Sequence, residues 1–204
     1  MGINWFEIRR KILHVLIGTL LLGLIAMKLI TPLAMFLVII FGAVMSVVSK
    51  KYRVPLLSWF LDNFDREKDR RQFPGRGVIS LFVGVLLAWK LFDAPIAYAS
   101  IMVLILGDSV SHLVGTHFGR IKNPLNGSKS LEGNLIGGLA GFIGAMLFVE
   151  PWTAAIGSFG AMLIEAIQIR MNENLIDDNI IVPLAAGALM TLAEILIHNW
   201  TAIL

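Results

Sequence analysis

The feature that most constrains this sequence is its succession of apolar stretches. Stretches that are long enough, or nearly so, to cross roughly 30 Å of membrane hydrocarbon as a helix recur along the whole chain. They cover residues 12–27, 32–48, 78–92, 94–114, 131–149, 154–169 and 180–197. With 57% hydrophobic and 15% charged residues, the chain is too apolar for a soluble domain of this length. The sequence therefore predicts an all-α, polytopic membrane bundle of about seven transmembrane helices.

The lysines and arginines test this number of spans. If the N-terminus is cytoplasmic, only Lys28 and Lys90 of the 17 basic residues fall on the opposite side of the membrane. This distribution follows the positive-inside rule and predicts a cytoplasmic N-terminus. The net charge of +3 faces the anionic inner leaflet, so we expect no nucleic-acid partner. No linker divides the chain, and we expect one integral membrane domain over residues 1–204.

Three segments leave alternatives open. The fourth and sixth apolar stretches contain Asp108 and Glu165, so either stretch can be a full span, a broken helix or a re-entrant segment. Residues 54–64 place apolar side chains at helical spacings between basic flanks. They fit either an amphipathic helix in the membrane interface or a solvated charged loop. In the fifth stretch, glycines four residues apart indicate close packing against a neighbouring helix.

Ionisable groups within apolar spans are costly, and each is a candidate functional residue. Asp108 carries most weight, because a carboxylate at the edge of an apolar run has few structural roles. Four residues follow it at i+3, i+4, i+7 and i+11, a spacing that predicts one helical stripe facing the protein interior. They are Ser111, His112, Gly115 and Gly119.

A polar loop and a helix start follow this stripe. Ser130 is a candidate N-cap, Glu132 lies in the first turn, and Lys129 precedes both. Free N–H groups and the helix dipole at such a position favour an anion. The carboxylate of Glu132 would repel a phosphate unless a cation lies between them, which suggests bridging Mg²⁺.

Two further clusters fall on the same predicted side of the membrane. Arg10, Lys11 and His14 lie near the start of the first span, and Asp177 and Asp178 precede the seventh. His14 can also be a satisfied interfacial histidine, and the two aspartates can simply cap a helix. Together with Glu165, these groups predict a polar layer at the cytoplasmic face.

Such a layer has the parts needed to hold a nucleoside triphosphate with its divalent cation. The P-loop pattern GxxxxGK[ST] is missing, so this is no Walker A site. Because apolar helices surround the layer, we expect the phosphoryl acceptor to be an amphipathic membrane lipid with a hydroxyl or phosphate head.

The segment from Asp108 to Gly133 resembles the proposed CTP-binding pattern of dolichol kinases. That pattern reads DxxAxxxGxxxG, then eight residues, then KKTxEG, and the spacing agrees throughout with this sequence, which ends "SKSLEG". Ser111 stands in place of alanine, Ser128 in place of the first lysine and Ser130 in place of threonine. "RKILH" and "DDNIIVP" resemble further elements of phytol kinases and CTP-using diacylglycerol kinases, and the short chain resembles the phytol kinase type.

The resemblance implies a CTP-dependent lipid-alcohol kinase, and it implies a role for each site residue. Asp108 and Glu132 would bind Mg²⁺ with CTP, and Asp178 would be a further metal ligand or the general base. Asp177, Glu165 and His14 are the other candidates for the base. The nucleotide-binding set would be Ser111, Gly115, Gly119, Ser128, Lys129, Ser130, Glu132 and Gly133.

Two other functions stay open. A cytidylyltransferase that makes a CDP-lipid from a lipid phosphate needs the same substrates, but its KDxxD-type signature is missing. A small transporter would use the intramembrane acids for ions. The alcohol itself stays open among phytol, farnesol-length prenols, polyprenols or dolichol, and diacylglycerol. We expect an integral protein of a prokaryotic cell membrane whose active site faces the cytoplasm; the oligomeric state is unknown.

Overall fold

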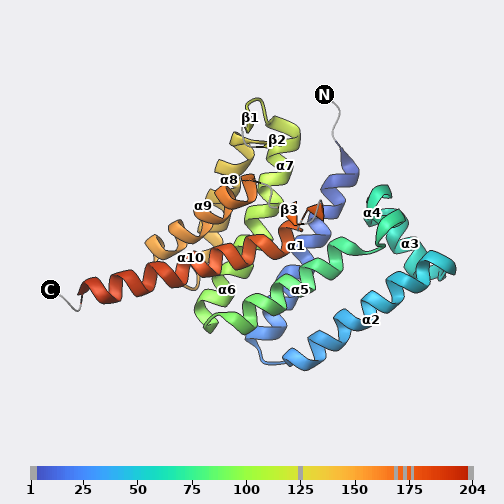
Figure 1. Cartoon of the computed structure of the whole chain (residues 1–204), viewed down its shortest axis with the longest axis horizontal. Coiled ribbons are helices and arrows are strands. Elements are labelled where there is room, and N and C mark those ends of the chain that lie inside the picture. Colours follow the sequence, from blue (N-terminus) through green and yellow to red (C-terminus); the bar gives the residue numbers. More distant parts are fainter. Residues whose placement is uncertain (1–3, 124–125, 168–169, 172–173, 176, 202–204) are drawn as a thin grey trace.

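Each of the seven apolar stretches forms a helix in the computed structural model, which describes residues 4–123, 126–167, 170–171, 174–175 and 177–201. The prediction of an all-α chain is confirmed, apart from two small hairpins (Figure 1). The long helices are α1 Trp5–Ala26, α2 Pro32–Lys51, α5 Arg76–Leu91, α8 Leu131–Ala145, α9 Pro151–Ile167 and α10 Asp178–Thr201, with α6 Ala94–Met102, η1 Val103–Asp108 and α7 Ser109–Phe118 forming the fourth.

Three of these helical runs are long and apolar enough to cross a membrane. They are Pro32–Lys51, Ala94–Phe118 and Asp178–His198, and the shorter Pro151–Ile167 is also apolar. These helices indicate a membrane protein, as the composition predicts. The number of seven spans and the cytoplasmic N-terminus remain predictions.

The fourth apolar stretch is a continuous helix rather than a broken one. Its middle, η1, is a π-helix that ends at Asp108, and α7 continues directly from Ser109. A π-turn inserts extra backbone into a helix and often lies at a functional site. The sixth stretch is also continuous within the described residues, as α9.

Small residues let the central helices approach closely. A Cβ atom added at Gly137 of α8 would lie 2.5 Å from the Ser111 Cβ of α7, and one at Gly141 would lie 2.5 Å from the Ser158 Oγ of α9. The predicted role of the glycine spacing in helix packing is therefore confirmed. A glycine also allows α5 to pack closely on α10, because a Cβ at Gly84 would lie 1.9 Å from the Asn179 carbonyl oxygen. That oxygen receives no hydrogen bond from residue 183 of its own helix, because Pro183 has no N–H.

The segment between α2 and α5 is helical. It contains α3 Pro55–Phe64 and α4 Glu67–Gln72 (Figure 1). α3 is amphipathic: Leu61 is buried, whereas Leu56 is 81% exposed and Trp59 is 61% exposed. Of the two alternatives for residues 54–64, the structure supports the amphipathic helix.

The described residues also form two hairpins. β1 Lys122–Asn123 pairs with β2 Asn126–Ser130, and β3 Arg170–Met171 pairs with β4 Asn174–Leu175, both antiparallel. The first hairpin carries the predicted nucleotide loop from α7 to α8. The second joins α9 to α10, so the C-terminal end of α9 and the N-terminal end of α10 lie at the same end of the bundle (Figure 1).

Candidate active site

Asp108 lies at the centre of a buried polar network. The π-helix η1 places its carboxylate against α1, where the Lys11 Nζ lies 2.6 Å from the Asp108 Oδ2. The His14 Nε2 lies 3.9 Å from the same oxygen. Both partners of the Lys11–Asp108 pair are buried, and a buried carboxylate without a cation would be strongly destabilising. The sequence elements "RKILH" and "GDSVSH" therefore meet in space.

A second cluster of charged side chains, formed by Lys129, Glu165 and Asp178, lies beside the network of Asp108. The Lys129 ammonium of β2 donates to Glu165 of α9, and it lies 2.9 Å from the Asp178 Oδ2 of α10. Burial alone would lower the pKa of Lys129, but the two carboxylates outweigh it and raise that pKa above its ordinary value. Lys129 is therefore a cation throughout the neutral pH range, and it joins three elements.

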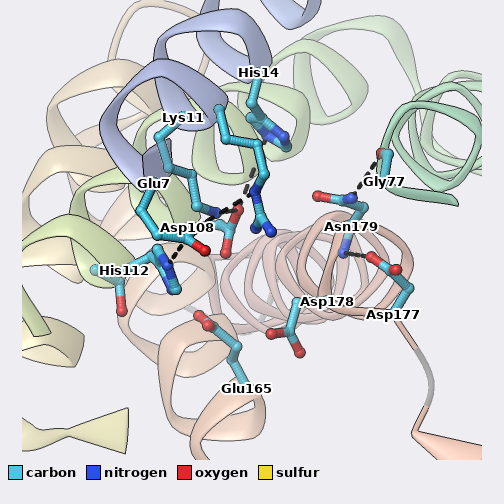
Figure 2. A network of polar contacts seen from close by, with 12 residues as sticks. Glu7, Lys11, His14, Gly77, Asp108, His112, Glu165, Asp177, Asp178 and Asn179 are labelled. Carbon is cyan, nitrogen blue, oxygen red and sulfur yellow. Dashed lines mark hydrogen bonds and ion pairs between the residues drawn. The ribbon is translucent and has the colours of Figure 1, made fainter. Parts of the chain in front are cut away.

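The network of Asp108 and the cluster of Lys129 adjoin each other, and three carboxylates converge between them (Figure 2). Oxygen atoms of Asp108, Glu165 and Asp178 all lie within 4.8 Å of one another. The Glu165 Oε2 is buried and has no hydrogen-bond partner among the described residues. Carboxylate oxygens in such a cluster are the ligands that Mg²⁺ prefers, and the unpaired oxygen fits a missing ligand. The donor set is therefore suited to a divalent cation.

A third network surrounds Glu7, a residue that was not among the predicted site residues. Arg66, from the connection between α3 and α4, donates two hydrogen bonds to the Glu7 carboxylate at 2.9 and 3.1 Å. The His112 Nε2 of α7 lies 2.9 Å from the same carboxylate. Burial would raise the pKa of Glu7, but the bonds to His112 and Arg66 and the nearby Arg10 hold it well below its usual range.

A signal for Glu7 was present in the sequence. Glu7 precedes Lys11 by four residues, so both lie on the same face of α1. Arg66 gave no comparable signal, because it stands in a segment crowded with charges. Its contact with Glu7 depends on a fold that brings residues 59 positions apart together.

Asp177 and Asn179 position the start of α10. The Asp177 Oδ1 accepts the Asn179 N–H at 3.1 Å, and Arg76 of α5 lies 3.3 Å from the Asp177 Oδ2. The Asn179 amide donates to the Gly77 carbonyl (Figure 2). It also donates to the Ser80 hydroxyl. Burial raises the pKa of Asp177 above its usual value. Of the two adjacent aspartates, Asp178 therefore faces the shared carboxylate space and Asp177 caps the helix.

The networks open into one cavity of about 750 Å³. Its walls come from α1, α3, α4, α5, η1, α7, β2 and the start of α10. Six basic side chains and five aspartates line it, a mixture that fits a polyanionic ligand bound together with a divalent cation. The basic residues are Arg10, Lys11, Arg66, Lys68, Arg76 and Lys129, and the aspartates are Asp65, Asp69, Asp108, Asp177 and Asp178.

The predicted nucleotide-binding glycines have a packing role in this structure. A Cβ atom at Gly115 would lie 3.1 Å from the Ser130 Oγ, and one at Gly133 would lie 2.6 Å from the Ser111 carbonyl oxygen. A Cβ at Gly119 would lie 2.5 Å from the Cβ of Ser130, the N-cap of α8. These glycines let α7 and the start of α8 pack backbone to backbone.

The predicted stripe begins at Asp108 of η1 and continues along α7, and its residues contact two different helices. Asp108 and His112 face α1, whereas Ser111 and Gly115 face α8. Ser111 and His112 separate for a geometric reason, because positions i+3 and i+4 lie on opposite sides of position i around a helix. The Ser111 hydroxyl donates to the Asn134 side-chain oxygen at 3.4 Å.

The start of α8 is built as the sequence predicts, with one difference. Ser130 is the N-cap, and its hydroxyl accepts the Gly133 N–H at 3.0 Å. The Glu132 carboxylate, by contrast, accepts the backbone N–H groups of Arg120 and Ile121 at 3.1 and 3.0 Å. Glu132 is not one of the three converging carboxylates. The side chain of Ser128 lies outside the described part of the structure.

The chain is similar to archaeal and plant proteins. An uncharacterised protein of Methanocaldococcus jannaschii is 31% identical over 181 residues, 87% of this chain and 88% of that protein. A probable chloroplastic phytol kinase of Triticum aestivum is 31% identical over 137 residues, 60% of this chain and 43% of that protein. The chloroplastic farnesol kinase of Arabidopsis thaliana is 28% identical over 141 residues, 62% of this chain and 45% of that protein. The alignments thus span less than half of both plant proteins. No protein-family model and no solved structure matches the chain.

Proposed function

Since this chain belongs to the same protein family as the Methanocaldococcus jannaschii protein, and since proteins named phytol and farnesol kinase are its homologues, we propose that it is a CTP-dependent lipid-alcohol kinase. It transfers the γ-phosphoryl group of CTP to the hydroxyl of a prenol-type membrane alcohol. The homologues support a kinase that acts on such an alcohol. CTP as the donor rests on the resemblance of residues 108–133 to the dolichol kinase pattern.

The observation that carries this proposal is the convergence of Asp108, Glu165 and Asp178 beside two lysines. Phosphoryl transfer requires positioning and neutralisation of charge, with little covalent chemistry from the protein. Lys11 and Lys129 lie at the carboxylates, and the arginines of the cavity lie around them. An ion transporter would need none of these cavity arginines.

The three carboxylates are the residues that would hold Mg²⁺. The buried, unpartnered Glu165 Oε2 fits a ligand position, and the mutual spacing of the three oxygens fits one shared cation. Bound there, Mg²⁺ supplies neutralisation of the negative charge on the phosphate oxygens. We assign Glu132 to the loop rather than to this set, because its carboxylate is occupied by two backbone N–H groups.

The protein side chains then perform the remaining tasks. Lys129 and Lys11 each offer an ammonium group to the phosphates, and Arg10 and Arg66 extend this positive surface along the cavity. Asp178 accepts the proton of the alcohol hydroxyl as general base, and His14 is the second candidate because its Nε2 is buried without a partner among the described residues. The alcohol oxygen bonds to the γ-phosphorus, the bond from that phosphorus to the bridging oxygen breaks, and CDP leaves.

We propose that the chain acts as one integral membrane domain of seven spans, with its N-terminus and its active site at the cytoplasmic face of a prokaryotic cell membrane. The distribution of lysine and arginine supports this orientation. The convergence of Lys11, Asp108, Lys129 and Asp178 supports it as well, because it places four predicted cytoplasmic ends side by side.

Two labels on CTP test the reaction directly. The purified protein in detergent receives Mg²⁺, farnesol or phytol, and CTP labelled at either the α- or the γ-phosphate. A kinase places the γ-label in the lipid and leaves the α-label in CDP. A cytidylyltransferase, given the prenyl phosphate, places the α-label in the lipid. Label transfer from ATP but not from CTP would contradict the choice of nucleotide.

A further inference from the structure

Along α1 and along α5, the lining of the cavity changes from charged to apolar. The cations of α1 and α5 stand at their N-terminal turns, at Arg10, Lys11 and Arg76. Further along the same helices, only apolar side chains line the cavity, apart from His14. These are Leu13 and Ile17 of α1 and Val78 and Leu81 of α5.

These four apolar residues are called the floor here, and on α1 the floor extends deeper into the bundle than the Lys11–Asp108 pair. Ile17 follows Lys11 by six residues, a rise of about 9 Å along α1. Beyond it the bundle is closed: a Cβ atom at Gly18 would lie 2.6 Å from the Ile105 side chain, and Leu21 is buried. The cavity therefore ends in an apolar pocket between α1 and α5 and does not continue through the protein.

Two aromatic residues of α3, here called the roof, line the same cavity. Phe60 and Phe64 of α3 line it, with their ring centroids 5.2 Å apart. On the outer surface of α3, Leu56 and Trp59 are exposed, as expected of a helix that rests on a membrane surface. The floor and roof together offer apolar surface on three elements, which favours a hydrocarbon ligand.

One polar atom marks the boundary between the charged and the apolar lining. The His14 side chain stands on α1 between the cations and Ile17, and its Nε2 is buried, 3.9 Å from the Asp108 Oδ2, without a hydrogen-bond partner among the described residues. A buried, unpaired nitrogen at this position fits a ligand with a single hydroxyl. A nucleotide would leave the floor uncovered, because its phosphates are drawn to the cations.

We propose that the floor formed by Leu13, Ile17, Val78 and Leu81 is the binding site for the first isoprene units of the lipid alcohol. The hydroxyl of the alcohol lies at His14, facing the neighbouring carboxylates of Asp108 and Asp178, and the nucleotide phosphates lie at the cations. This inference rests on the proposed function, because it assigns the acceptor's place within that same cavity.

A matched pair of substitutions on α1 tests the assignment. Ile17→Trp fills the floor, whereas Leu16→Trp places the same ring on the outer face, where Leu16 is 62% exposed. Ile17→Trp should raise the KM for farnesol by about tenfold or more and leave the KM for CTP within about twofold. Leu16→Trp should change neither constant. Equal farnesol constants for the two folded variants, checked by size exclusion, would overturn the proposal.

A photoreactive ligand decides the question without turnover. The wild-type protein is irradiated with a farnesol analogue that carries a diazirine on its first isoprene unit, and the labelled residues are located by mass spectrometry. We expect labels on residues 13–17 and 78–81, with competition by unmodified farnesol. Labels confined to the outer faces of the helices would overturn the site. A wild-type protein that binds farnesol at the floor but never phosphorylates it would instead overturn the proposed function.

Discussion

At the scale of single residues, the site depends on charges that neutralise one another. Lys129 joins Glu165 and Asp178, and it stands beside the Lys11–Asp108 pair. The buried members, Lys11, Asp108 and Glu165, could not remain charged without such partners. The same chemistry makes the cluster suitable for phosphates, because a phosphate offers each lysine a second anionic partner.

Lys129→Met tests that role. A hydrogen bond to a charged group contributes about 1.5–3 kcal/mol, so we expect kcat/KM for CTP to fall about 10- to 100-fold. Lys122→Met is the matched control, because Lys122 lies exposed on the neighbouring strand. Steady-state kinetics on both variants measures the effect, and equal constants would remove Lys129 from the nucleotide site.

Glu7 gives a prediction about pH. Its partners hold its folded-state pKa below the unfolded value of about 4.3, so its stabilising contribution is present above that pH and is lost as the pH falls. Glu7→Gln should therefore lower the unfolding temperature at pH 7, and its difference from wild type should shrink below about pH 4. Exposed Glu67→Gln should show no such trend. A difference for Glu7→Gln that is independent of pH would contradict the ion-pair explanation.

At the scale of helices, the glycines of α8 fix how closely α7 can approach. We expect Gly137→Ala to destabilise the protein by about 1–3 kcal/mol, because its Cβ would overlap Ser111 and the Gly107 carbonyl oxygen. Gly23→Ala in α1 should be neutral or slightly stabilising, because no described atom beyond the neighbouring backbone of α1 lies within 4 Å of the added Cβ. Unfolding by denaturing detergent measures both. Equal stability of the two variants would show that α7 and α8 tolerate a wider separation.

Much of the helical structure could be predicted from the sequence. Hydropathy located the helices, and the Ser130 cap and the glycine packing of α8 followed from local rules. The side chain of Glu132 could not be placed in the same way. Whether it faces a cation or the backbone of Arg120 depends on the path of the hairpin, which no helical periodicity encodes.

The sequence also could not show that the residues of the stripe that begins at Asp108 contact two different helices. Periodicity showed that Asp108 and Ser111 share one side of a helix, but not that α1 and α8 each take one of them. Only the three-dimensional arrangement decides which neighbour each residue meets. The contact of Arg66 with Glu7 likewise joins residues far apart in the sequence and depends on the tertiary structure.

At the scale of the whole molecule, the proposed topology has a direct test. The chain has no cysteine, so single cysteines report on membrane sidedness without background. In intact cells, Lys28→Cys and Lys90→Cys should react with an impermeant maleimide, whereas Lys51→Cys and Arg120→Cys should react only after lysis. The reverse pattern would invert the bundle, and a mixed pattern would change the number of spans.

If one carboxylate cluster performs the proposed phosphoryl transfer, Asp108→Asn should lose activity and Asp93→Asn should keep it. Asp93 is an exposed aspartate at the start of α6, on the opposite predicted side of the membrane. With γ-labelled CTP, Mg²⁺ and farnesol, Asp108→Asn should lose about 1,000-fold in rate, the equivalent of several kcal/mol of charge stabilisation. Asp93→Asn should match wild type. A folded Asp108→Asn variant that phosphorylates farnesol at the wild-type rate would contradict the claim.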